Sequence, residues 1–173
     1  MTQALPPIER LYNLGRLASA GDDITFAAKP DELLRIREWA EVRSVEAMTA
    51  RITLKKLSAS AFRYDAELRA ELTQDCVVTL EPVSSTIERR IHRELHYGES
   101  GADDSDVVVD ADADEVREEI SDLRYDLAAP LLEELALAID PYPRAPGVTF
   151  SPPSDQGDRH ESPFSVLGKL KKP

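Results

Sequence analysis

The chain has a single cysteine, Cys76, which is the first residue to consider for nucleophilic or metal chemistry. A catalytic thiol needs a base, and none of the histidines, His92, His96 and His160, has motif spacing to it. A tetrahedral zinc site would need further thiolates, and the sequence has no second cysteine. We expect Cys76 to be a buried, unreactive residue of a strand. A small thiol-dependent enzyme that uses Cys76 is kept as an alternative function from another class.

The histidine pair is the second candidate for chemistry. His92 and His96 are four residues apart, as zinc-binding pairs on helices are, but Glu94 is misplaced for the protease pattern and no third ligand follows. Solvated positions on a strand are the better interpretation. The sequence also has no glycine-rich phosphate loop and no nucleophile elbow. It therefore predicts no catalytic residue, no metal ligand and no cofactor, and we expect a protein that is not an enzyme.

Two other groups of residues are candidates for contact with a partner or with RNA. Arg89, Arg90 and Arg93 form the densest basic cluster, which either contacts phosphates or pairs with the surplus of acidic residues. The rigid Tyr142-Pro143-Arg144 segment either presents an aromatic ring and a guanidinium to a partner or ends a helix, with Tyr142 packed on the sheet.

An acidic stretch dominates the charge of the chain. The net charge is −12, and the segment 99–126 holds twelve acidic residues against two arginines. Its aspartates lack the central glycine of an EF-hand calcium loop, so a solvated acidic loop is expected. Such a loop can imitate nucleic-acid phosphates and shield a basic partner protein. The net negative charge disfavours direct RNA binding, but such binding stays open because the remainder of the chain is nearly neutral.

Periodicity predicts the elements that position these residues. Alternation over 48–57 and over 62–72 predicts two half-buried strands, and 8–14, 24–28, 76–80, 87–97 and 123–127 are further candidates. The candidates 8–14 and 24–28, the first two along the chain, are expected to form a hairpin. Apolar spacing after Pro30 and again after Pro130 predicts two helices. On the strand 87–97, Arg93 falls on the apolar face, so it must reach an edge or pair with a carboxylate.

These elements predict an α+β fold: an antiparallel sheet of five to six strands, with barrel closure as an option, and two helices. The 173 residues fit a single domain over 1–147, with a flexible acidic loop at 98–119 and a disordered tail at 148–173. Within the tail, Phe164 to Leu167, followed by three lysines, is a possible docking motif. With neither a signal peptide nor an apolar run long enough to span a bilayer, we expect a cytoplasmic protein without membrane contact.

Two strings of the sequence resemble a known family. The strings 76–82 (CVVTLEP) and 133–144 (EELALAIDPYPR) look like the pattern of the bacterial YceD proteins, in the version seen in alphaproteobacteria. A weaker echo lies at 162–164. Many members have a second cysteine three residues after the first, where this chain has Thr79. The residues that carry the motif are Cys76, Thr79, Leu80, Pro82, Glu134, Leu135, Asp140 and Pro141.

The resemblance implies a non-enzymatic factor that supports the accumulation or assembly of large-subunit ribosomal RNA. It implies as partner a ribosomal protein or a large-subunit assembly intermediate, and leaves direct contact with ribosomal RNA as the alternative. Neither the sequence nor the resemblance predicts an oligomeric state.

Overall fold

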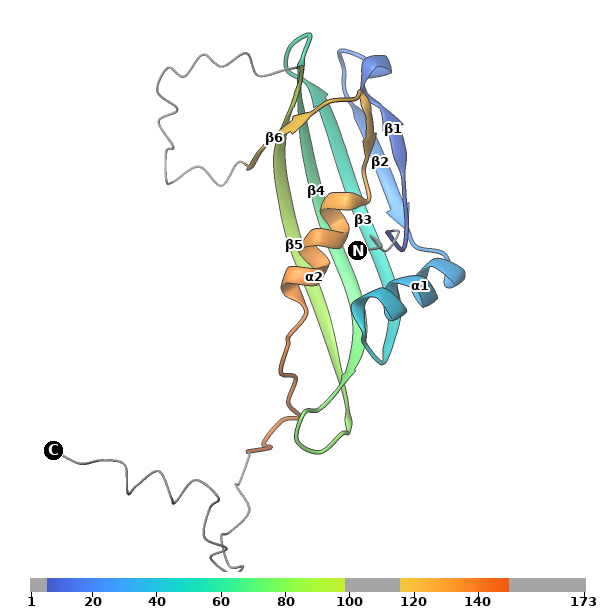
Figure 1. Ribbon diagram of the computed structural model, residues 1–173, viewed down its shortest axis with the longest axis vertical. Coiled ribbons are helices and arrows are strands. Elements are labelled where there is room, and N and C mark those ends of the chain that lie inside the picture. The colour runs from blue at the N-terminus through green and yellow to red at the C-terminus, as the bar shows by residue number, and fades with distance from the viewer. Residues whose placement is uncertain (1–5, 99–115, 150–173) are drawn as a thin grey trace, which may run out of the picture.

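A long, curved sheet forms the body of the protein in the computed structural model, which describes residues 6–98 and 116–149 (Figure 1). Most of the predicted acidic loop and the tail from residue 150 lie outside the described residues. The main sheet has the order β2-β3-β4-β5-β6. Its strands are β2 (Asp22–Ala27), β3 (Ser44–Lys56), β4 (Ala61–Asp75), β5 (Pro82–Tyr97) and β6 (Val116–Ile120).

Both helices lie on one face of this sheet. α1 (Pro30–Ala40) packs against β3, and α2 (Ala129–Ala138) packs against β5 and β4. A short two-stranded sheet accompanies them, made of β1 (Leu11–Asn13) and β7 (Arg124–Asp126), with a 3₁₀ turn at Leu14–Arg16. The predicted α+β class and its two helices are confirmed.

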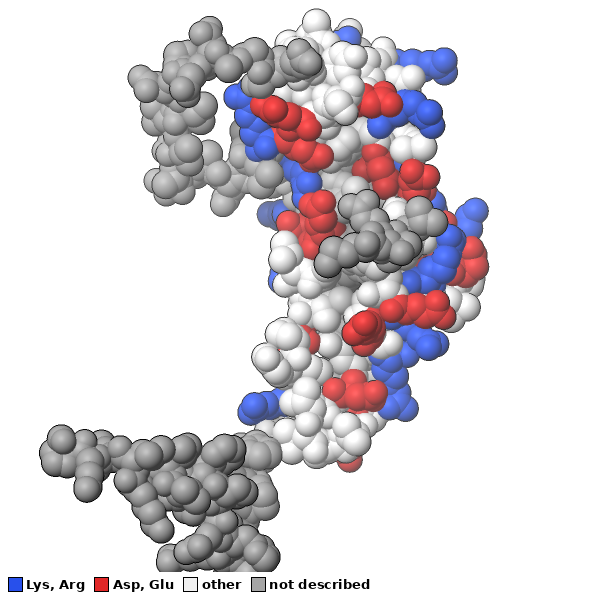
Figure 2. All heavy atoms as spheres, in the orientation of Figure 1, with Lys and Arg blue, Asp and Glu red and all other residues white. Residues whose placement is uncertain are grey.

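The alternating pattern of β3 and β4 builds the core. Met48 pairs with Ala70, Leu54 pairs with Tyr64, and all four side chains are buried between the sheet and the helices. Paired residues in neighbouring strands share a face, so the polar positions between them form the opposite, open face. On the face that carries the helices, Figure 2 shows acidic and basic side chains interleaved along the body.

Two features of the sheet differ from the prediction. β6 pairs with β5 in parallel, Arg93 opposite Val116 and Tyr97 opposite Ile120, so the sheet is mixed rather than wholly antiparallel. It is also not a barrel, because β2 and β6 are edges that do not pair with each other. β6 begins at Val116, inside the stretch predicted to be a loop. Its backbone pairing with β5 compensates for the acidic sequence that favoured a loop.

The expected hairpin between the first two strands does not form. β1 pairs with β7, more than a hundred residues away, while β2 pairs with β3. The reason is a set of hydrogen bonds just before β1: the Arg10 N–H donates to Asp126 Oδ1 (2.7 Å), and the Leu127 N–H donates to the Arg10 carbonyl (2.9 Å). These bonds hold the N-terminal segment beside the start of α2.

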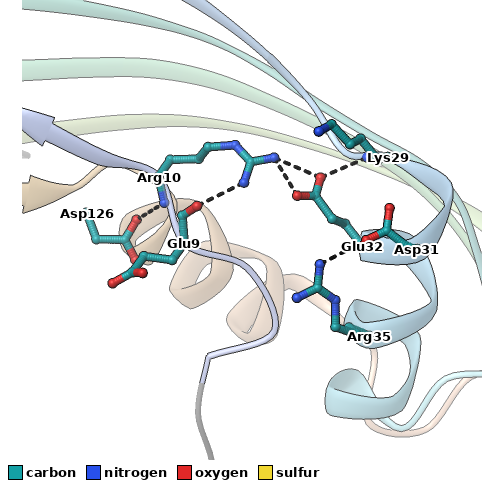
Figure 3. A network of polar contacts seen from close by, with 7 residues as sticks. All are labelled: Glu9, Arg10, Lys29, Asp31, Glu32, Arg35 and Asp126. Atoms are coloured by element: carbon teal, nitrogen blue, oxygen red, sulfur yellow. Dashed lines mark hydrogen bonds and ion pairs between the residues drawn. The ribbon is translucent and has the colours of Figure 1, made fainter.

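Arg10 also fastens α1 to this junction (Figure 3). Its Nη2 donates to Glu32 Oε1 at 2.6 Å and to Oε2 at 2.8 Å, and the Lys29 N–H donates to Oε2 at 2.9 Å. Glu32 is 5% exposed. Burial opposes its ionisation, but the hydrogen bonds from Arg10 and Lys29 outweigh that cost and hold the pKa of Glu32 below its usual value.

Candidate functional site

The first family-like string forms a tight loop between β4 and β5. The Cys76 N–H donates to the Glu81 carbonyl (2.8 Å), and the Leu80 N–H donates to the Cys76 carbonyl (2.9 Å). Leu80 has a φ of 61°, in the left-handed region that residues with a Cβ seldom adopt. The predicted strand over 76–80 is therefore wrong: β4 ends at Asp75, and the chain turns at once.

The second string lies directly against this loop. Gln74 Nε2 donates to the Asp140 carbonyl (2.8 Å), and the Val77 N–H donates to the carbonyl of the buried Pro143 (2.9 Å). The Ala145 N–H points at Cys76 Sγ, 3.4 Å away. The strings, more than fifty residues apart in the sequence, thus form one structure, which we call the tip: the loop 76–81 and the segment 140–145.

The Cys76 side chain is the internal anchor of the tip. It is 0% exposed, so the predicted burial is confirmed, although it lies in a loop rather than in a strand. Hydrogen bonding by the Thr79 side chain, followed by backbone N–H groups of Ala145, Thr79 and Val78, lowers the pKa of Cys76 to about 7. The enzyme alternative requires an accessible sulfur, which this position does not offer.

The outer surface of the tip carries several exposed apolar side chains. Leu80 is 73% exposed and Tyr142 is 71% exposed, and Val77 and Val78 are also exposed. Arg144, in the same tip, is also exposed. On the face that Figure 2 shows, this lower end of the molecule has an uncharged area with basic and acidic side chains at its margins. Of the two interpretations of Tyr142, the structure favours presentation to solvent over packing on the sheet.

The three arginines of the basic cluster do not all lie on one surface. Arg89 pairs with Leu68 and Arg93 with Tyr64, on the face covered by the helices, whereas Arg90 pairs with Glu67 on the open face. Arg89 and Arg90 are exposed. Arg89 and Arg90 nevertheless both line one shallow depression, which Arg93 does not, and Tyr142, Pro143 and Arg144 lie in the tip.

Arg93 holds three elements together. Its Nη1 donates to Glu118 Oε2 of β6 (3.1 Å), its Nη2 to Glu133 of α2, and Tyr125 Oη donates to the same Glu118 oxygen (2.9 Å). The prediction that Arg93 pairs with a carboxylate is confirmed. Burial works against its charge, but hydrogen bonds to Glu133 and Glu118 prevail and raise the pKa of Arg93, while burial raises the pKa of Tyr125.

The histidine pair lies on β5, as predicted. His92 Nδ1 is 2.9 Å from Asp65 Oδ1, and His96 Nε2 is 2.9 Å from Glu94 Oε1. Within residues 6–98 and 116–149, no three potential metal ligands are grouped closely enough to hold an ion. In the same part of the chain, no helix combines the length and the hydrophobicity needed to cross a membrane.

Sequence reasoning missed the Arg10–Glu32 contact and the solvent exposure of Leu80. A signal for the first was Glu32 at the third position of α1, where a carboxylate often accepts the N-cap amide. For Leu80 the sequence offers no signal, because a leucine among β-branched residues is typical of a buried strand.

One comparison with known proteins gives a match. The model of the family described as "Large ribosomal RNA subunit accumulation protein YceD" matches residues 64–171, more than half of the chain. The match includes both strings of the tip and extends through the tail. No curated protein and no solved structure matches the chain.

Proposed function

The chain belongs to the YceD family, and from this membership we propose that it is a non-enzymatic factor for the accumulation or assembly of large-subunit ribosomal RNA. We propose that it acts in the cytoplasm by binding a ribosomal protein or an assembly intermediate of the large subunit. Its alphaproteobacterial type stays a prediction.

The observation that carries this proposal is the exposed leucine of the tip. Leu80 sits in a left-handed conformation that costs roughly 1–2 kcal/mol for a residue with a Cβ, and most of its side chain lies in solvent. Strained backbone and exposed apolar side chains both concentrate at binding sites. Tyr142 and Arg144, of residue types common in interface hot spots, lie on the same tip.

Charge supports a protein as the partner. With a net charge of −12 the chain repels phosphate backbones at long range, whereas basic ribosomal proteins are attracted to it. Arg93, one of the three arginines considered for RNA contact, is 12% exposed at its side chain and is held by two carboxylates.

Direct contact with ribosomal RNA is the second candidate, and one feature favours it. A shallow depression, mostly on the open face, has charged lining residues of both signs: Arg51, Arg69, Arg89 and Arg90 with Glu67 and Glu88. Arg69 pairs with Glu88 and Arg90 with Glu67, but no described residue forms an ion pair with Arg51. Phosphate binding here would be strongly salt-dependent.

The test is recovery of partners from lysate by the tagged full chain, at low and high salt, with and without ribonuclease. We compare the wild type with Leu80→Asp/Tyr142→Asp and with Leu11→Asp, a matched control at an exposed leucine on β1. The proposal expects identified large-subunit proteins that survive ribonuclease, persist in Leu11→Asp and are lost from the tip variant.

Either of two outcomes contradicts this mechanism. Equal recovery by the tip variant would show that the tip is not the contact surface. Recovery that is lost on ribonuclease treatment and in Arg51→Glu/Arg90→Glu would instead support direct RNA contact through the open face.

A further inference from the structure

A hollow of about 220 Å³ lies where the C-terminal ends of the two helices meet. Trp39, Ala40 and Glu41 line it from the α1 side, and Ala136 and Ile139 line it from the α2 side. Trp39, the only tryptophan of the chain, remains 37% exposed. The hollow is thus an apolar surface that the described residues leave partly uncovered.

The rim of this hollow is negative. Glu41 lines it, and Glu38 and Asp140 are adjacent in sequence to its lining residues. No described residue forms an ion pair with Glu38 or Glu41. The C-terminal ends of α1 and α2 add the negative ends of two helix dipoles; Arg37 lies in the last turn of α1, whereas α2 has no basic residue in its last turn. An occupant should therefore be apolar with basic residues beside it.

The chain itself contains a segment of this kind. In 162–173 (SPFSVLGKLKKP), Phe164, Leu167 and Leu170 recur at three-residue spacing, and three lysines are interspersed with or follow them. A helix with this spacing would carry the three apolar side chains on one side, the arrangement by which helices occupy apolar grooves. The family match extends to residue 171, so the segment belongs to the matched pattern.

The segment is within reach of the hollow. Ile139 lines the hollow, and Thr149 follows ten residues later, so the two are at most about 36 Å apart. The fifteen residues from Thr149 to Phe164 span up to about 50 Å when extended. Chain length therefore permits docking within one molecule.

We propose that the C-terminal segment 163–172 docks in cis into the hollow between the ends of α1 and α2, with its apolar side chains against Trp39 and its lysines toward the acidic rim. This inference does not depend on the identity of the ribosomal partner. It assigns an intramolecular role to a segment that the tip does not use.

Trp39 provides the readout, because its emission wavelength and its quenching by acrylamide report on solvent access. We compare the full chain with Phe164→Ala/Leu167→Ala and with Phe150→Ala, a matched control at the other phenylalanine of the tail. The proposal expects a red shift and stronger quenching in the double variant only, with unchanged circular dichroism. Identical spectra for all three proteins would overturn it, as would an equal effect of Phe150→Ala.

Charge reversal gives an independent test of the docking. Lys169→Glu/Lys171→Glu should expose Trp39 in the same way, and adding Glu38→Lys/Glu41→Lys should restore its protection. The protection should be independent of protein concentration. If it is lost on dilution, the segment binds a second copy and the proposal of docking in cis is overturned.

Discussion

The tip and the Arg93 cluster both join distant parts of the chain, but by different means. At Arg93, one guanidinium and two carboxylates connect β5, β6 and α2, and the charges neutralise one another within the fold. At the tip, backbone groups and a thiol hold the segments together, and apolar side chains are left facing solvent. The comparison teaches that one arginine of a dense basic cluster can be structural, while an ordinary-looking apolar string can be the exposed surface.

Removing Arg93 should have the largest effect on stability. Arg93→Met leaves Glu118 and Glu133 without their cation, and because both retain some contact with water, we expect a loss of about 2–3 kcal/mol in the free energy of unfolding. Arg90→Met is the matched control, since its 3.7 Å pair with Glu67 is exposed and contributes about 0.5 kcal/mol or less. Urea denaturation measures both, and similar losses would remove the distinction between a structural and a surface arginine.

Glu32→Gln tests the other buried arginine contact and has a pH signature. We expect a loss of about 2 kcal/mol at neutral pH, because a charge-assisted hydrogen-bond pair to Arg10 is weakened. The pKa of Glu32 is lowered on folding, so its contribution is complete above the unfolded pKa and is lost as pH falls through the folded pKa. The difference from wild type in chemical denaturation should therefore disappear at acidic pH. A difference that persists there would show that charge is not its origin.

Leu80→Gly separates the structural role of Leu80 in the tip from its proposed role in binding a partner. Glycine adopts the φ of 61° without strain but raises the entropy of the unfolded chain, so the free energy of unfolding should change by less than about 1 kcal/mol. Recovery of large-subunit proteins should nevertheless fall, because the exposed side chain is gone. Undiminished recovery from a stable variant would make Leu80 a structural residue, like Arg93.

Thr79→Val should have the smallest effect, confined to the thiol. Without the hydroxyl, the pKa of Cys76 should rise from about 7 toward its ordinary value, as followed by the ultraviolet absorbance of the thiolate. Because folding lowers this pKa, Cys76 stabilises the wild type above the unfolded pKa, and that contribution is lost as pH falls through about 7. Thr79→Ser keeps the hydroxyl and should titrate as the wild type does. Equal titration of Thr79→Val would show that the backbone N–H groups alone set the pKa.

The sequence predicts well those features that depend on local periodicity. Strict alternation identified β3 and β4, and the position of Arg93 on the apolar face of β5 predicted that it reaches an edge or pairs with a carboxylate, as it does. It did not identify Glu118 or Glu133, because their approach depends on parallel pairing and on the placement of a helix. The resemblance pointed to both strings of the tip, but not to their contact.

The errors have a common physical origin. Val77, Val78 and Thr79 have the β-branched side chains of a strand, yet hydrogen bonds from the loop to itself and to Pro143 determine a turn. β6 has the charge of a solvated loop, yet Arg93 and pairing with β5 stabilise it. In both cases contacts from distant segments override the local preference.

The parallel pairing of β5 with β6 has a consequence for how this protein can change. β5 ends at Tyr97, and β6 re-enters the sheet opposite Arg93, so both ends of the connecting segment are fixed within a few residues of each other along the same edge. The entropy of closing such a connection rises only slowly with its length. Insertions and deletions between Gly98 and Val116 should therefore be tolerated. This connection is a place where family members can diverge, and where a fluorescent or affinity label can be inserted without disturbing the tip.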